Sequence, residues 1–259
     1  MDRVKCVTPD DVPLAVDSLT IRYGDRIAVD NLSFAIQPGQ IFGLLGPNGA
    51  GKTSTLKAIL GLVEKKGGRT LIYGKDVAED PAYVKSHIGA VLESPVLFDS
   101  LTPNEFIEFV ASVRRITNTD RIANLVGAFA LEEYMDTPIA SLSMGNRQKT
   151  TIVAALMSEP RLLLLDEPFN SLDIRSVKIF RELILNHVRK GNSVLFSTHI
   201  LDVVEKMCEH IGIIDRGRMV EQGTVAELRE RLKGSTLEEI FLRATNMERE
   251  IESLLKGLE

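Results

Sequence analysis

The sequence predicts an α/β fold in which a glycine-rich loop joins a strand to a helix. Three observations support this prediction. Segments typical of strands and helices alternate along most of the 259 residues, the apolar run 162–165 has no polar interruption, and the glycine-rich segment 46–53 lies between an apolar run and a helical pattern. Because 44% of the residues are hydrophobic, the chain can bury a sizeable core, as one large domain or as one domain with a subdomain.

The first hundred residues contain the expected β-strands of the amino-terminal half. Apolar and β-branched runs predict strands at residues 14–23, 27–36, 40–45, 69–73 and 88–92. The turn Gly24-Asp25-Arg26 joins the first two of them. The third strand leads into the glycine-rich segment, and a helix is expected to follow over residues 54–62.

The periodicity becomes helical from residue 102 to about residue 133. Thr102 can cap this helix, Pro103 suits its first position, and Glu105 completes a capping box. One face of the helix carries an apolar stripe that we expect to pack in the core, formed by Phe106, Phe109, Val110 and Val113. The helical stretch over about residues 94–158 is therefore predicted to interrupt the sheet as a subdomain.

The second half of the chain returns to alternating strands and helices. The apolar run 162–165 is expected to be a strand covered on both faces. The elements predicted after it are helices at about 176–189 and 201–207, and strands at 193–197, 211–214 and 219–222. From Leu228 to the end, the sequence is charged and helical, with apolar residues at Ile240, Phe241, Leu254 and Leu255.

Composition excludes several classes of function. The net charge is −5 and uninterrupted basic runs are only pairs, so neither a nucleic-acid surface nor a polybasic membrane anchor is expected. Cys6 and Cys208 form no metal-ligand pattern and indicate a reduced, cytosolic setting. Residues 1–13 lack the apolar segment of a signal peptide, and no apolar run approaches the ~18 residues of a spanning helix. Any membrane-spanning part is expected on another chain.

The glycine-rich segment fits the phosphate-binding pattern G-x-x-x-x-G-K-[ST]. Glycines let backbone N–H groups turn toward phosphate oxygens, and the start of the following helix adds its positive dipole end. Lys52 is expected to reach the β- and γ-phosphates, and the Thr53 hydroxyl to ligate Mg²⁺. The predicted nucleotide-binding residues here are Gly46, Pro47, Asn48, Gly49, Ala50, Gly51, Lys52, Thr53 and Ser54. A chance glycine-rich turn is the alternative, which the flanking strand and helix disfavour.

Two carboxylates follow the apolar strand at residues 162–165. Asp166 ends the strand, where it can hold Mg²⁺ beside the phosphate loop, and Glu167 can polarise an attacking water. The alternative is an acidic strand end that caps the next helix.

A third segment, Leu142-Ser143-Met144-Gly145, places a serine and a glycine at the start of a helix. The dipole of that helix could face phosphate oxygens. By itself the segment is weak evidence, because Ser143 is also an ordinary helix N-cap.

The order of these motifs resembles that of ABC transporter ATP-binding subunits. After the phosphate loop come the Leu-Ser-x-Gly segment, the run Leu-Leu-Leu-Leu-Asp-Glu-Pro, Ser171-Leu172-Asp173 and Ser197-Thr198-His199, and the similarity spans about residues 14–225. The resemblance implies a P-loop NTPase core with a mixed sheet, an N-terminal antiparallel β subdomain and an inserted α-helical subdomain at about 94–158. Residues 226–259 would then form a C-terminal helical extension.

The resemblance also implies roles for single residues. Ser143 and Gly145 match the signature that binds the γ-phosphate of ATP held by the opposite subunit. Asp173 matches the carboxylate of the loop that crosses the dimer interface, and His199 matches the histidine that senses the γ-phosphate. Tyr23 matches the aromatic residue that stacks on adenine. Plainer interpretations stay open: His199 as a capping or packed histidine, and Tyr23 as a strand-end aromatic.

Several positions depart from the usual family pattern. Glu93 stands where most members have Gln, and we expect it near Mg²⁺. Met144 replaces a usual Gly, Asn146 replaces a usual Gln, and Ser171 stands where Gly is commoner. A Glu at position 93 resembles the pattern of the subgroup that exports peptide antibiotics or confers immunity to them, such as bacitracin and lantibiotic transporters. Residues 235–242 also resemble the endings of drug and peptide exporter subunits.

Taken with the resemblance, the sequence predicts an ATPase subunit that uses ATP and Mg²⁺, with Lys52, Glu167 and His199 in the catalytic site. Two copies, as a homodimer, would sandwich two ATP molecules and drive a separate transmembrane permease, with the subunit on the cytoplasmic face of the cell membrane. Two alternatives remain. One is a soluble ATPase of the same fold without a membrane partner, and the other is a non-catalytic nucleotide switch.

Overall fold

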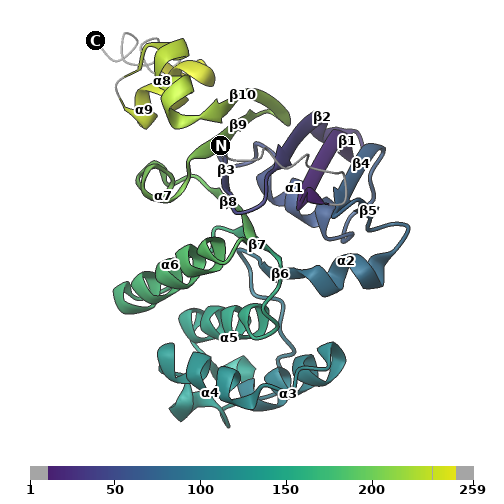
Figure 1. The fold of residues 1–259 in the computed structure, drawn as a ribbon, viewed down its shortest axis with the longest axis vertical. Helices are drawn as coiled ribbons and strands as arrows, with labels where there is room; N and C mark the ends of the chain where they lie inside the picture. The colour runs from purple at the N-terminus through teal and green to yellow at the C-terminus, as the bar shows by residue number, and fades with distance from the viewer. Residues whose placement is uncertain (1–10, 235, 249–259) are drawn as a thin grey trace, which may run out of the picture.

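The computed structural model describes residues 11–234 and 236–248 (Figure 1). The strands are β1 (Leu14–Tyr23), β2 (Arg26–Ile36), β3 (Ile41–Leu45), β4 (Gly67–Ile72), β5 (Lys75–Asp76), β6 (Ile88–Val91), β7 (Leu162–Asp166), β8 (Ser193–Thr198), β9 (His210–Asp215) and β10 (Arg218–Thr224). The α-helices are α1 (Lys52–Ile59), α2 (Pro81–His87), α3 (Pro103–Arg114), α4 (Thr119–Ala128), α5 (Met144–Leu156), α6 (Ile174–Arg189), α7 (Leu201–Met207), α8 (Val225–Leu232) and α9 (Leu237–Ala244). Two short 3₁₀ turns, η2 (Glu132–Tyr134) and η3 (Ile139–Ser141), connect α4 to α5.

Two sheets organise the fold, as the sequence predicts. A mixed six-stranded sheet has the order β10-β9-β3-β8-β7-β6, in which only β10 is antiparallel to its neighbour. A four-stranded antiparallel sheet has the order β2-β1-β4-β5. Because β3, β8 and β7 are adjacent and parallel, their carboxyl ends meet at one edge, where open α/β sheets bind ligands. The phosphate loop, Thr198 and Asp166 therefore come together there.

Strand β7 shows why its leucines are uninterrupted. Leu162 and Leu164 pack with α1 and the antiparallel sheet, whereas Leu163 and Leu165 pack on the opposite face with α5 and α6. Successive side chains of a strand point to opposite faces, so a strand between two covered faces needs apolar residues at every position. The expectation of a doubly covered strand is confirmed.

The helical stretch differs from its prediction in two ways. It is broken after α3, where Arg115 adopts a left-handed φ of 55°. The apolar stripe of α3 is only partly in the core, because Phe106 is buried but Phe109 and Val113 are 50% and 67% exposed. The prediction of a fully packed stripe is therefore wrong. The core-facing side of α3 contacts α5, while the far edge of the stripe faces solvent, where the Phe109 ring lies 5.8 Å from that of Phe98.

Other differences concern short elements and helix ends. Helix α1 starts at Lys52, two residues before its predicted start, and ends at Ile59. The sequence did not predict β5 or α2, a seven-residue helix whose N-cap Asp80 accepts a hydrogen bond from Tyr83 N. Figure 1 shows α3, α4 and α5 gathered at the end of the molecule opposite α8 and α9.

The two carboxyl-terminal helices pack on the main body. Leu228, Leu237 and Ile240 all join the core cluster that contains α5 and α6. Cys6, Ser235, Leu254 and Leu255 lie outside the described residues. Within the part of the chain that the structure describes, no helix combines the length and the apolar character needed to cross a bilayer.

Candidate nucleotide-binding site

The loop between β3 and α1 has the backbone geometry that its glycines permit. Gly51 has a φ of +111°, and a Cβ there would lie 2.6 Å from the carbonyl oxygen of Ala28. A Cβ at Gly46 would collide with the carbonyl oxygen of Ile214. The backbones of the neighbouring strands β2 and β9 therefore pack against the loop too closely for a side chain at these positions. Glycine is required there for packing as well as for the turn.

Lys52 is the buried cation of this loop, with only 6% of its surface exposed. Its Nζ donates hydrogen bonds to the carbonyl oxygens of Gly46, at 2.7 Å, and Pro47, at 3.3 Å. Burial lowers the pKa of Lys52, and the negative charges of Glu167, Asp166 and Glu93 oppose that shift. The amine thus lies among three carboxylates at the end of the loop.

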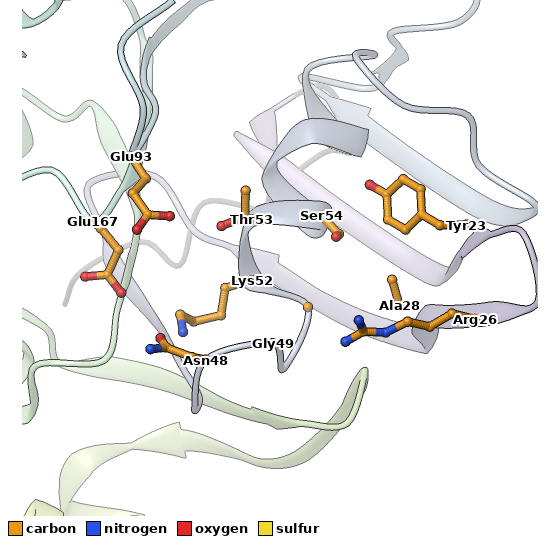
Figure 2. A pocket seen from close by; sticks show the side chains of 11 residues that line it. Tyr23, Arg26, Ala28, Asn48, Gly49, Lys52, Thr53, Ser54, Glu93 and Glu167 are labelled. Atoms are coloured by element: carbon orange, nitrogen blue, oxygen red, sulfur yellow. The ribbon is translucent and has the colours of Figure 1, made fainter.

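A pocket of about 410 Å³ opens over the loop (Figure 2). It is lined by Tyr23, Arg26, Ala28, Asn48, Gly49, Gly51, Lys52, Thr53, Ser54, Glu93 and Glu167. The sequence predicts all of these except Arg26 and Ala28, which lie on β2. Figure 2 shows Glu93 and Glu167 close together at one end and Tyr23 with Arg26 at the other. Gly46, Pro47 and Ala50 belong to the loop but do not line the pocket.

Asp166, the last residue of β7, and Glu167, which directly follows it, occupy different environments. Asp166 is fully buried; its Oδ1 accepts a hydrogen bond from Ser197 Oγ, and its Oδ2 has no hydrogen-bond partner among the described residues. Glu167 is 5% exposed and adopts a left-handed φ of 45°. Thr198 Oγ1 donates to Glu167 Oε2 at 2.8 Å, and His199 Nδ1 lies 2.7 Å from Oε1. Strained backbone of this kind is common at functional sites.

The side chains here fit a Mg²⁺ site that nucleotide oxygens complete. Asp166 offers a buried carboxylate oxygen without a partner, and Thr53 and Glu93 bring further oxygen atoms to the pocket. Residues 11–234 and 236–248 contain no group of three or more His, Cys, Asp or Glu side chains able to hold a metal by themselves. Mg²⁺ in nucleotide sites is typically held by one or two carboxylates together with substrate phosphates.

Ser143, Gly145 and Asp173 do not line this pocket. Ser143 caps α5, since its Oγ accepts a hydrogen bond from Asn146 N at 3.2 Å, and its side chain is exposed. The helix-cap interpretation therefore describes its contacts within one chain, and any contact with phosphate has to come from a nucleotide outside this pocket.

The start of α5 packs closely on the loop after Glu167. A Cβ at Gly145 would lie 2.7 Å from the carbonyl oxygen of Ser171. Lys149 Nζ lies 2.7 Å from Asp173 Oδ2, and its hydrogen bond lowers the pKa of Asp173. Ser171 has a φ of 64°, which explains physically why glycine suits that position better. Sequence reasoning missed Lys149, because no local pattern links it to Asp173.

Comparison with known proteins agrees with this geometry. A family model described as ABC transporter matches residues 29–170. The ABC-type transporter ATP-binding protein EcsA of Bacillus subtilis is 37% identical over 238 residues, which cover 90% of this chain and 96% of EcsA. The linearmycin resistance ATP-binding protein LnrL of the same species is 33% identical, over 90% of this chain and 76% of LnrL.

Solved structures give the same answer. A protein described as an ATP binding subunit of an ABC transporter superposes with a TM-score of 0.84 at 32% identity, covering 89% of this chain and 98% of that one. The resemblance that the sequence predicts is thereby confirmed. This chain belongs to the ABC transporter family, as an ATP-binding subunit.

Proposed function

We propose that this subunit hydrolyses ATP with Mg²⁺ at the pocket over the phosphate loop and couples hydrolysis to transport by a separate membrane-spanning permease. The observation that carries the proposal is that Glu167 and Lys52 line the same pocket, with the buried Asp166 directly before Glu167 at the end of β7. An ATPase assay of the subunit, alone and co-purified with its permease, tests it directly. Hydrolysis that the permease does not change would contradict the coupling.

In this proposal, the backbone N–H groups of residues 46–53 and the Lys52 amine bind the phosphates. The Thr53 hydroxyl and Asp166 hold Mg²⁺, which neutralises charge on the phosphates. Glu167 orients and polarises the attacking water, and the contact with His199 fixes the orientation of its carboxylate. Tyr23, at the far end of the pocket, stacks on adenine.

A second copy of the chain completes each site. Ser143 and Met144 are exposed, and neither Ser143, Gly145 nor Asp173 lines the pocket of its own chain. The start of α5 also offers backbone N–H groups and a positive helix dipole. We therefore assign these residues to the nucleotide held by the opposite subunit, in a homodimer that ATP closes and hydrolysis opens.

Ser143→Arg tests this assignment. The substitution should slow hydrolysis about tenfold or more, roughly 1.4 kcal/mol of barrier, while leaving the ATP affinity of the isolated monomer nearly intact. Asn118→Arg is the matched control, because Asn118 caps α4 as Ser143 caps α5 and lies outside the proposed interface. If Ser143→Arg hydrolyses ATP at the wild-type rate, the segment is only a helix cap.

An apolar groove of about 360 Å³ supports a membrane partner. Its apolar walls include Leu62, Ile88, Leu92, Val96, Phe106 and Val110. In the segment 92–96, Leu92 and Val96 line this groove, whereas Glu93 lines the nucleotide pocket. We propose that an apolar segment of the permease occupies the groove, so that its movement reaches the nucleotide through this segment.

The permease would hold the subunit at the cytoplasmic face of the cell membrane. We further propose that the complex exports a drug or peptide antibiotic, in line with the resistance function in the name of LnrL. Residues 14–225 would form the ATP-binding domain and 226–259 its extension. The exposed groove disfavours a soluble ATPase without a membrane partner, and the polar contacts of Glu167 disfavour a non-catalytic switch.

Glu93→Gln tests the extra carboxylate at the proposed metal site. Carboxylates close together repel, so the metal is needed to hold the wild-type site in its working geometry. The substitution should weaken the dependence of hydrolysis on Mg²⁺ concentration and retain a rate within about tenfold of wild type, roughly 1.4 kcal/mol. An ATPase titration with Mg²⁺, with and without the permease, measures this. Identical titrations of mutant and wild type without the permease would leave Glu93 a role in coupling alone.

A further inference from the structure

The hairpin that carries Tyr23 also carries an arginine on the same face. Tyr23 and Arg26 are directly opposed across β1 and β2, whereas Arg22 is opposed to Ile27. Directly opposed residues of antiparallel strands project from the same face of a sheet, and successive residues project from opposite faces. Tyr23 and Arg26 accordingly both line the nucleotide pocket, and Arg22 does not.

Arg26 points along the pocket toward the phosphate loop. Figure 2 shows its guanidinium below the Tyr23 side chain, extending toward Gly49. Its Nη2 lies 3.7 Å from the position that a Cβ of Gly49 would take. In the part of the chain that the structure describes, the guanidinium makes no hydrogen bond or ion pair. The hairpin thus presents a cation with its donors available to the pocket.

The charges of the pocket are divided along its length. Lys52 and Arg26 are the cations among the lining residues, and Lys52 lies at the end that holds Glu93 and Glu167. Arg26 lies at the Tyr23 end, and its guanidinium extends from there toward the loop at Gly49. For a nucleotide with its base on Tyr23 and its terminal phosphates on Lys52, the phosphate nearest to the Tyr23 end is the α-phosphate.

We propose that Arg26 is a phosphate-binding residue of this site, whose guanidinium contacts the α-phosphate of ATP and of ADP. The proposal rests on the nucleotide site proposed above. A guanidinium suits it, because its planar N–H donors match phosphate oxygens and stay charged at any physiological pH. The α-phosphate is not transferred during hydrolysis, so the contact stabilises ground state and transition state alike. It therefore lowers Kd and KM without changing kcat.

The test compares Arg26→Ala, Arg26→Lys and the control Arg22→Ala, which removes the same charge from the other face of the hairpin. Equilibrium titrations with ATP and with ADP measure Kd, and steady-state hydrolysis measures KM and kcat. Arg26→Ala should weaken both nucleotides by about 5- to 30-fold, the scale of a charge-assisted contact, with kcat within twofold of wild type. Arg26→Lys should recover part of the loss, and Arg22→Ala should bind both nucleotides within twofold of wild type.

Three results would overturn the proposal. An Arg26→Ala variant that binds both nucleotides within twofold of wild type leaves the residue an ordinary solvated cation. Loss of ATP affinity without loss of ADP affinity moves the contact to the γ-phosphate. Equal losses of nucleotide affinity in Arg22→Ala and Arg26→Ala would show that the effect is a general electrostatic attraction and not a specific contact. Lys52→Ala is measured in parallel. If Lys52→Ala retains tight ATP binding, the nucleotide site itself is misplaced. If Lys52→Ala loses ATP binding while Arg26→Ala binds normally, only the role of Arg26 is overturned.

Discussion

Lys52→Ala is expected to abolish tight ATP binding, with an affinity loss of about 100-fold or more, roughly 2.7 kcal/mol. Lys52 is buried beside the loop that would hold the phosphates, and its amine already donates to two carbonyl oxygens of that loop. An alanine removes a charge-assisted contact with the β- and γ-phosphates. It also leaves Glu93, Asp166 and Glu167 without their shared cation, so an incoming triphosphate meets uncompensated negative charge.

An equilibrium titration with ATP in Mg²⁺ measures this loss. Lys57→Ala is the matched control, because Lys57 lies in the last turn of the same helix α1 and does not line the pocket. Thermal unfolding without nucleotide shows whether both variants keep their fold. ATP affinity of Lys52→Ala within about threefold of wild type, under ~0.7 kcal/mol, would contradict the assignment of the site.

Glu167→Gln should slow hydrolysis by about 100-fold or more while preserving ATP binding, the scale of a lost general base. The amide has the shape of the carboxylate, and its oxygen can still accept the hydrogen bond that Thr198 Oγ1 donates. What it loses is the negative charge that polarises water.

Single-turnover hydrolysis by Glu167→Gln, with ATP binding measured in parallel, separates chemistry from affinity. Glu133→Gln, an exposed position outside the pocket, controls for the loss of one acidic charge. A rate within tenfold of wild type would assign the base to another group. Equal loss of binding and rate would instead indicate damage to the pocket.

Most of the sheet could be predicted from local patterns, because strand β7 and the phosphate loop each carry a strong signal of their own. The uninterrupted leucines of β7 report that both faces are covered. Periodicity was less informative on α3. It identifies residues that share a face, but the width of the surface packed against that face depends on tertiary structure, so the exposure of Phe109 and Val113 could not be read from it.

The site could be predicted where its residues adjoin a motif. Asp166 and Glu167 could be predicted as site residues because they lie where a predicted strand ends. The sequence does not show that Asp166 is fully buried while Glu167 has a left-handed backbone and faces the pocket. These differences arise only when the turn after β7 is folded. The sequence analysis did not identify Arg26 because its position near Gly49 depends on which residues of β1 and β2 are paired. That register is set by pairing along the whole strand and cannot be read from the residues around Arg26.

The most direct test of the central claim, that two copies of this chain enclose ATP between them, is the mass of Glu167→Gln in solution. Size-exclusion chromatography with light scattering should give 28.6 kDa without nucleotide and twice that mass with ATP and Mg²⁺, because slow hydrolysis lets the closed dimer accumulate. The double variant Ser143→Arg/Glu167→Gln should stay at 28.6 kDa under both conditions. A single-chain mass for Glu167→Gln in ATP and Mg²⁺, at protein concentrations well above the expected affinity, would contradict the account.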